Sequence, residues 1–151
     1  VKINSELRTL DVDQSDTLLM MLRETAGVKS PKIGCERGDC GSCTVLLDDK
    51  SVRSCLVLAV ETDSQHVKTV EGLCEDGLTP LQEKFIEYSS FQCGFCASGV
   101  LISATELLEK NPNPSKEEVK ETLSGNLCRC TGYEPIVEAV LDVNKCSKGR
   151  N

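Results

Sequence analysis

Residues 34–45 read GCERGDCGSCTV and set three cysteines in a C-x4-C-x2-C pattern, with a fourth cysteine a little downstream. This is the spacing of loops that bind a plant-type [2Fe–2S] cluster. Three thiolates come from one tight loop, and the fourth comes from a neighbouring element. A structural zinc site is the alternative, but zinc loops usually use paired C-x2-C hooks. The predicted ligands of this first cluster are Cys35, Cys40, Cys43 and Cys55.

Three glycines lie in the same loop, namely Gly34, Gly38 and Gly41. Glycine tolerates positive φ and lets backbone N–H groups approach anionic sulfurs, where their hydrogen bonds help to set the reduction potential. The loop chemistry therefore favours an iron–sulfur cluster over zinc or disulfides.

A second group of four cysteines lies further along the chain, as a C-x2-C pair and a C-x-C pair that 31 residues separate. Both pairs come just before predicted helices, whose N-termini carry positive partial charge and free N–H groups that suit an anionic cluster. Zinc remains an alternative for this group taken alone. The first group favours a second cluster, whose predicted ligands are Cys93, Cys96, Cys128 and Cys130.

Composition narrows the possible partners of the 151-residue chain. The formal net charge is −7 and no Lys/Arg cluster is visible, so neither a nucleic acid nor an anionic membrane surface is an expected partner. No apolar run approaches the length of a membrane span, and no signal-peptide pattern is present. We therefore expect a cytoplasmic protein in which clustered cysteines bind metal. The first residue is Val1, which leaves export by a cleaved signal open.

The first half of the chain is predicted to be β-rich with one helix. Val1–Ile3 and Leu7–Val12 alternate around a turn, as in a hairpin. Ser15 or Asp16 can cap a helix that Gly27 would end. The apolar residues of this helix are Leu18, Leu19, Met21 and Leu22.

Two further apolar runs, Thr44–Leu47 and Cys55–Val60, are expected as strands on either side of a turn at 48–50. The first cysteine loop lies between the helix and these runs. Strand pair, helix, cysteine loop and further strands follow the order of a β-grasp ferredoxin.

The second half is predicted to be a bundle of four short helices at about 80–88, 98–110, 116–123 and 136–144. Two of them open with capping boxes, formed by Thr79 with Gln82 and by Ser115 with Glu118. The predicted linker is Glu71–Gly77. The expected fold class is thus α+β, with a ferredoxin-like [2Fe–2S] domain at 1–75 followed by a four-helix [2Fe–2S] domain at 76–151.

Three segments together resemble the iron–sulfur subunit of the xanthine oxidase family of molybdenum hydroxylases. They are Gly34–Val45, Gln92–Cys96 and Gly125–Tyr133, and the resemblance extends from about Ile3 to Val140. The stretch SGNLCRCTGY at 124–133 is the most specific part. One departure is that residues 97–99 read Ala-Ser-Gly where the family usually has Thr-Pro-Gly, so Ser98 would cap the following helix.

The resemblance implies roles for individual residues. The first cluster would lie nearer a flavin, and the second nearer molybdenum. Gln92 would hydrogen-bond a pterin, and Cys130 would also approach it. Gly94 and Gly132 would allow close approach of the backbone.

The resemblance also implies an electron-transfer subunit that does not turn over alone and relays electrons one at a time from a molybdopterin site to FAD. The pterin would be molybdopterin, with a cytosine dinucleotide as one form it takes. A large molybdopterin subunit and a medium FAD subunit would be the partners, in a dimer of heterotrimers. The substrate is left open.

Two other functions compete with this hypothesis. A free-standing ferredoxin would explain the first cysteine group but leaves the second unexplained, and a zinc-stapled interaction module would bind no iron. Cys74 and Cys146 match no ligand position and are expected to be ordinary thiols, while the single histidine, His66, is expected at a solvated strand edge.

Overall fold

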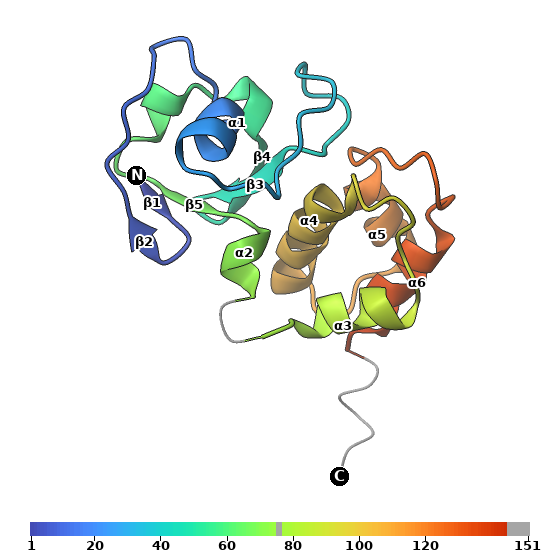
Figure 1. The fold of residues 1–151 in the computed structure, drawn as a ribbon. Helices are drawn as coiled ribbons and strands as arrows, with labels where there is room; N and C mark the ends of the chain where they lie inside the picture. The colour runs from blue at the N-terminus through green and yellow to red at the C-terminus, as the bar shows by residue number, and fades with distance from the viewer. Residues whose placement is uncertain (75–76, 145–151) are drawn as a thin grey trace.

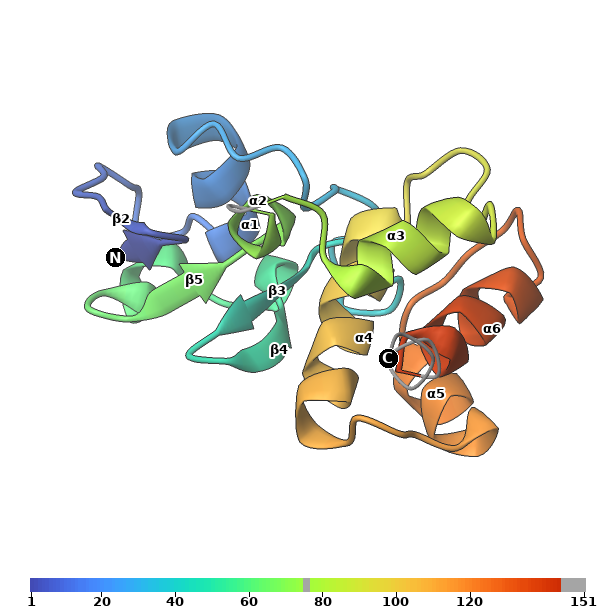
Figure 2. The same cartoon turned by 90° about the horizontal axis from the view of Figure 1, so that it is seen from below.

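The computed structural model describes residues 1–74 and 77–144, and these form a sheet-containing half and a helical half that lie side by side (Figures 1 and 2). A five-stranded sheet has the order β2-β1-β5-β3-β4. β1 pairs in parallel with β5, whereas the other pairings are antiparallel. The strands are β1 Lys2–Ile3, β2 Glu6–Leu7, β3 Thr44–Leu47, β4 Lys50–Arg53 and β5 His66–Lys68.

One helix covers the sheet. The α-helical turn α1, Leu18–Met20, continues as a π-helix, η1, over Met21–Thr25. Thr17 caps it by accepting a hydrogen bond from the backbone N–H of Met20 at 3.2 Å. The predicted cap at Ser15 or Asp16 is wrong, because the Asp16 carboxylate instead accepts from the backbone N–H of Asp13. The core between helix and sheet contains Ile3, Leu18, Met21, Leu22, Val45, Ala59 and Val67.

The predicted strand over Cys55–Val60 is also wrong. Asp48 and Asp49 both have positive φ, 47° and 62°, as in a two-residue hairpin turn. The strand that pairs with β3 is therefore β4, which begins directly after the turn, and the pairing ends at Arg53. The apolar run that follows forms two 3₁₀ turns instead, η2 Ser54–Leu56 and η3 Ala59–Thr62.

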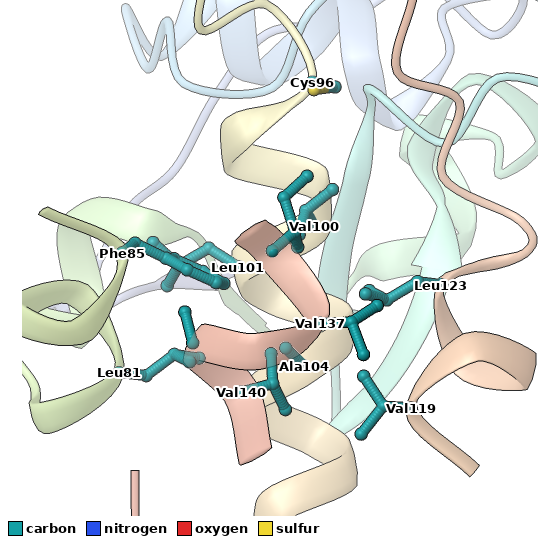
Figure 3. Close-up of a cluster of buried hydrophobic side chains, with 12 residues drawn as sticks. Leu81, Phe85, Cys96, Val100, Leu101, Ala104, Val119, Leu123, Val137 and Val140 are labelled. Atoms are coloured by element: carbon teal, nitrogen blue, oxygen red, sulfur yellow. The ribbon is translucent and has the colours of Figure 1, made fainter. Parts of the chain in front are cut away.

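The four predicted helices of the second half are confirmed, and both capping boxes are present. Buried side chains from all four helices meet in one core, with Cys96 at its edge where one of them begins (Figure 3). The helices are α3 Pro80–Glu87, α4 Ala97–Lys110, α5 Lys116–Leu123 and α6 Glu134–Asp142.

Part of the predicted linker is helical, since α2 spans Val70–Leu73. The predicted boundary between residues 75 and 76 lies outside the described residues. The two halves contact each other directly, because α4 packs against β3 and β4. No helix in the described part of the chain is long and apolar enough to cross a membrane. The α+β fold class is confirmed.

Candidate metal centres

The first cysteine group is assembled by the loop between η1 and β3 and by the turn after β4. The thiol of Cys35 accepts the backbone N–H of Cys40 at 3.3 Å. Cys43 and Cys55 are buried, with 2% and 7% of their surface exposed, and both pack on Leu19. The Ser54 hydroxyl donates to the carbonyl of Cys43 at 2.6 Å and so holds the turn that brings in Cys55.

The electrostatics of this group differ between its outer and inner thiols. Hydrogen bonds from the backbone N–H groups of Arg37 and Cys40 lower the pKa of Cys35 to about 6. Burial, reinforced by the neighbouring thiol of Cys43, raises the pKa of Cys55 to about 11. A buried set of thiolates is therefore stable only when cations neutralise it, and bound metal deprotonates its ligands outright.

Two glycines of the loop have structural reasons to lack a side chain. A Cβ at Gly34 would lie 2.8 Å from the Sγ of Cys40. Gly38 has a φ of +90°, and a Cβ there would lie 2.5 Å from Cδ1 of Leu56. The loop thus lies close to the thiol of Cys40 at Gly34, and at Gly38 it lies close to Leu56, the residue after Cys55.

The second cysteine group has a buried edge and an exposed edge. Cys96 is the N-cap residue of α4 and is 6% exposed. Cys93 and Cys130 are exposed, and their Sγ atoms lie 3.6 Å apart. Ser98 does not cap α4 as predicted, and its buried hydroxyl has no hydrogen-bond partner.

Tyr133 closes the loop that carries the C-x-C pair, a role that the sequence did not reveal. Its hydroxyl accepts from the backbone N–H of Cys128 at 2.7 Å and donates to the carbonyl of Asn126 at 3.2 Å. Its φ of +71° is in the left-handed region, where a residue with a side chain is strained. The sequence offers no signal for this role, because the positive φ of Tyr133 is known only from coordinates.

The thiols of the second group also differ in pKa. Burial and a hydrogen bond with Cys128 raise the pKa of Cys96 to about 12. Burial also raises the pKa of Cys128, but the hydroxyl of Thr131 and backbone N–H groups outweigh it and lower the pKa overall. A hydrogen bond with Cys93 raises the pKa of Cys130.

The donor sets fit two [2Fe–2S] clusters. All nine cysteines of the described segments are free thiols, and eight of them belong to the two groups. Within each group the strongest thiol–thiol interactions form two pairs, and weaker electrostatic interactions link the pairs. This suits a rhomb whose two irons each take two thiolates. Across residues 1–74 and 77–144, no three Cys, His, Asp or Glu side chains converge as a site for a single metal ion. The contacting pairs are Cys35 with Cys40, Cys43 with Cys55, Cys93 with Cys130, and Cys96 with Cys128.

The predicted pterin-contacting residues gather at the exposed edge of the second group. The side-chain amide of Gln92 donates to the carbonyl of Cys130 at 3.0 Å and is exposed. Gly94 and Gly132 have φ of +77° and +68°, and a Cβ at either would meet nothing within 4 Å. The structure thus brings Gln92, Gly94, Cys130 and Gly132 to one accessible edge, while their roles stay predictions.

Cys74 and His66 take part in neither cysteine group. The thiol of Cys74 donates to the carbonyl of Val70 at 3.2 Å and accepts from the Gln82 amide at 2.6 Å. His66 lies on β5, and its Nε2 contacts the carbonyl oxygen of Asn4 at 2.8 Å, so it is less solvated than expected. Cys146 lies outside the described residues.

A fold with a ferredoxin-like sheet domain, a helical domain and two four-cysteine groups defines a two-cluster iron–sulfur protein. Comparison with protein families agrees, because a family described as "2Fe-2S iron-sulfur cluster binding domain" matches residues 1–84. A second family, "[2Fe-2S] binding domain", matches residues 69–141.

Similar proteins narrow this class. The nicotine 6-hydroxylase small subunit of Paenarthrobacter nicotinovorans is 56% identical over 142 residues, which cover 94% of this chain and 86% of that protein. The nicotinate dehydrogenase small FeS subunit of Eubacterium barkeri is 42% identical, with 97% and 95% covered. The crystal structure of quinoline 2-oxidoreductase from Pseudomonas putida 86 contains a chain with a TM-score of 0.92 and 45% identity, with 99% and 95% covered.

This chain belongs to the small iron–sulfur subunits of the xanthine oxidase family of molybdenum hydroxylases. In the aldehyde oxidoreductase of Desulfovibrio gigas, the matching region is only 17% of a longer chain, with a TM-score of 0.91 and 38% identity. The two domains thus occur both as a separate subunit and within a larger polypeptide.

Proposed function

We propose that the chain relays electrons one at a time from a molybdopterin site to FAD, both held by partner subunits. The observation that carries this proposal is the arrangement of two four-thiol groups in one chain, with the second open to solvent along one edge at Cys93 and Cys130. When bound, each [2Fe–2S] cluster supplies reversible uptake of a single electron. The chain's own part is to hold the thiols, exclude water from the buried pair, and present the exposed edge.

Each residue set has a part in this proposal. Cys35, Cys40, Cys43 and Cys55 hold the cluster on the FAD side, and Cys93, Cys96, Cys128 and Cys130 hold the one on the molybdenum side. Gln92 is already oriented by its hydrogen bond to the carbonyl of Cys130. It keeps its amide oxygen and one N–H for a pterin. Gly94 and Gly132 leave space for that pterin to reach the backbone.

The proposed partners are a large molybdopterin-binding subunit and a medium FAD-binding subunit, in a dimer of heterotrimers. The names of similar proteins support this, since they are small subunits of nicotine and nicotinate enzymes. The chain has no catalytic residue of its own in this proposal. Turnover, by hydroxylation of a substrate with oxygen from water, belongs to the large subunit.

Metal and flavin analysis of the tagged chain purified from its native host tests the proposal. About four irons per chain, with molybdenum, FAD and two larger co-purifying chains, is the expected result. Iron without molybdenum or partners would indicate a free-standing ferredoxin instead. Zinc in place of iron would contradict a redox function altogether.

Substitution of single residues tests the ligand and pterin assignments. Cys130→Ala should abolish the spectroscopic signal of the molybdenum-side cluster and electron flow to FAD, whereas the matched control Cys74→Ala should keep both. Gln92→Ala should retain all iron but slow reduction of the clusters by substrate. Two intact cluster signals in Cys130→Ala would refute the ligand assignment, and loss of iron in Gln92→Ala would mean that Gln92 is structural.

A further inference from the structure

The two halves of the molecule meet at a buried asparagine that the function has not explained. Asn126 is 1% exposed and lies two residues before Cys128. Its side-chain amide donates to the carbonyl of Gly41, in the first cysteine loop, at 3.1 Å. Its side-chain oxygen accepts from the hydroxyl of Ser103 on α4 at 2.9 Å. One side chain thus joins the first cysteine loop, the second cysteine loop and the helix between them.

An arginine makes a second bridge beside Asn126. Arg53 ends β4, two residues before Cys55, and its guanidinium donates to the hydroxyl of Thr44 at 2.7 Å. The same guanidinium donates across the junction to the carbonyl of Gly125, also at 2.7 Å. Both bridges therefore tie segments that contain or adjoin ligands of the first cysteine group to the loop that carries ligands of the second.

Two glycines let the backbones touch at this junction. A Cβ at Gly41 would lie 2.2 Å from the carbonyl oxygen of Gly125. A Cβ at Gly99, in the first turn of α4, would lie 2.1 Å from the carbonyl oxygen of Gly41. No side chain fits in either place unless the two halves move apart.

One backbone hydrogen bond links a predicted ligand of the first group to the residue that precedes a predicted ligand of the second. The backbone N–H of Leu127 donates to the carbonyl of Cys40 at 2.8 Å. Leu127 is bonded to Cys128, and Cys40 belongs to the first group. A path from one thiol to the other therefore follows covalent bonds of three residues and crosses one hydrogen bond.

We propose that Asn126 and Arg53 are positioning residues for electron transfer, which hold the Cys40 carbonyl against the Leu127 amide so that this hydrogen bond couples the two cluster sites. This inference rests on the proposed function. One electron passes from the site of Cys128 to the site of Cys40, which oxidises the first by one electron and reduces the second. No proton moves and no bond forms or breaks. The electron comes from the substrate-oxidising partner, or from dithionite in a test.

Another contact across the junction offers a matched control. The backbone N–H of Ser51 donates to the carboxylate of Glu106 at 3.2 Å, which also joins β4 to α4. Neither residue adjoins a predicted ligand. A variant that loses this contact weakens the packing between the two halves but leaves the hydrogen bond between Leu127 and Cys40 unchanged.

The test compares Asn126→Ala, Arg53→Gln and the control Glu106→Ala in the full chain loaded with iron. Iron content and the spectrum of each cluster are measured first. The magnetic interaction between the two clusters in the dithionite-reduced chain, and the rate of electron exchange after partial reduction, are measured next. We expect Asn126→Ala and Arg53→Gln to keep about four irons and lose both the interaction and fast exchange, while Glu106→Ala keeps them.

Wild-type coupling in both junction variants would overturn the inference, as would an equal loss in Glu106→Ala. Loss of iron from both junction variants would also overturn it, because the junction would then serve cluster binding and not coupling. A wild-type chain without two cluster signals would contradict the proposed function itself. Two cluster signals in the wild-type chain without fast electron exchange between the clusters would contradict only the inference about the junction.

Discussion

Replacing Gly41 by alanine should weaken the chain more than the same change at Gly27, because only Gly41 faces the other half of the molecule. Both glycines are in the left-handed region, with φ of +73° and +75°. An alanine at either costs about 1–2 kcal/mol for that conformation. At Gly27 the added Cβ meets nothing within 4 Å, whereas at Gly41 it would lie 2.2 Å from the carbonyl oxygen of Gly125.

The close contact adds a second cost to the Gly41 variant. Overpacking of a tight interior costs about 1–3 kcal/mol. We therefore expect a loss of about 2–5 kcal/mol in the free energy of unfolding for Gly41→Ala, against about 1–2 kcal/mol for Gly27→Ala. Each kcal/mol lowers Tm by about 2–4 °C in a chain of this size.

Thermal unfolding followed by circular dichroism, with iron content measured in parallel, decides the comparison. Gly27→Ala should keep its iron and lose only a few degrees of Tm. Equal losses of Tm in the two variants, within about 2 °C, would refute the close junction between the halves. A more stable Gly41→Ala would refute the assigned backbone conformation as well.

Three further predictions follow from side-chain contacts. Burial raises the pKa of Glu106, but hydrogen bonds from Lys110 and Ser51 outweigh it and lower the pKa overall. Glu106→Gln should therefore destabilise the chain by at most about 1.5 kcal/mol at pH 7. The difference in urea unfolding should be full above the unfolded pKa of about 4.3 and vanish as pH falls through the depressed folded pKa. A difference between wild type and Glu106→Gln that increases as the pH falls would contradict this prediction. Cys74→Ala should leave iron content unchanged and cost less than about 1.5 kcal/mol, because it loses only bonds to Val70 and Gln82. Tyr133→Phe removes the acceptor of the Cys128 N–H and should lower stability by about 1–3 kcal/mol. Redox titration should show a shifted reduction potential for one cluster only. A shift of both potentials would contradict the assignment of Cys128 to the second cluster.

Local signals in the sequence were sufficient to predict the helical half. A capping box such as that of Thr79 and Gln82 is complete within four residues, and the structure forms both of its hydrogen bonds. The apolar positions that follow recur at helical spacing, so the core of the bundle is encoded within each helix. Little depends on residues far away in the chain, which is why the bounds of these helices differ from the prediction by only a few residues.

The β-rich half was predicted less well because its strands depend on partners. The run Cys55–Val60 is as apolar as a strand. The tight turn at Asp48 and Asp49 nevertheless places Lys50–Arg53 beside β3, and these residues form the pairing instead. β1 and β5 pair in parallel although about sixty residues separate them. Neither pairing leaves a mark in the local pattern of apolar residues.

The cysteine groups were visible in the sequence because iron–sulfur clusters are usually held by cysteines at restricted spacings. The junction between the groups was not visible. Asn126 and Arg53 are ordinary polar residues, and the acceptors of their hydrogen bonds across the junction are the backbone carbonyls of Gly41 and Gly125. A backbone acceptor can belong to any residue type, so no sequence pattern reveals such a bond. Spacing can therefore predict a site, while the relation between two sites needs coordinates.

The exposed thiols of the two groups all belong to the second group. In the first group, Cys43 and Cys55 are enclosed and Cys40 approaches the junction through its carbonyl. In the second, Cys93 and Cys130 are exposed on the edge where Gln92 also lies. Under the proposed function, the exposed edge would accept electrons from one partner, and the buried junction would pass them inward to the first group.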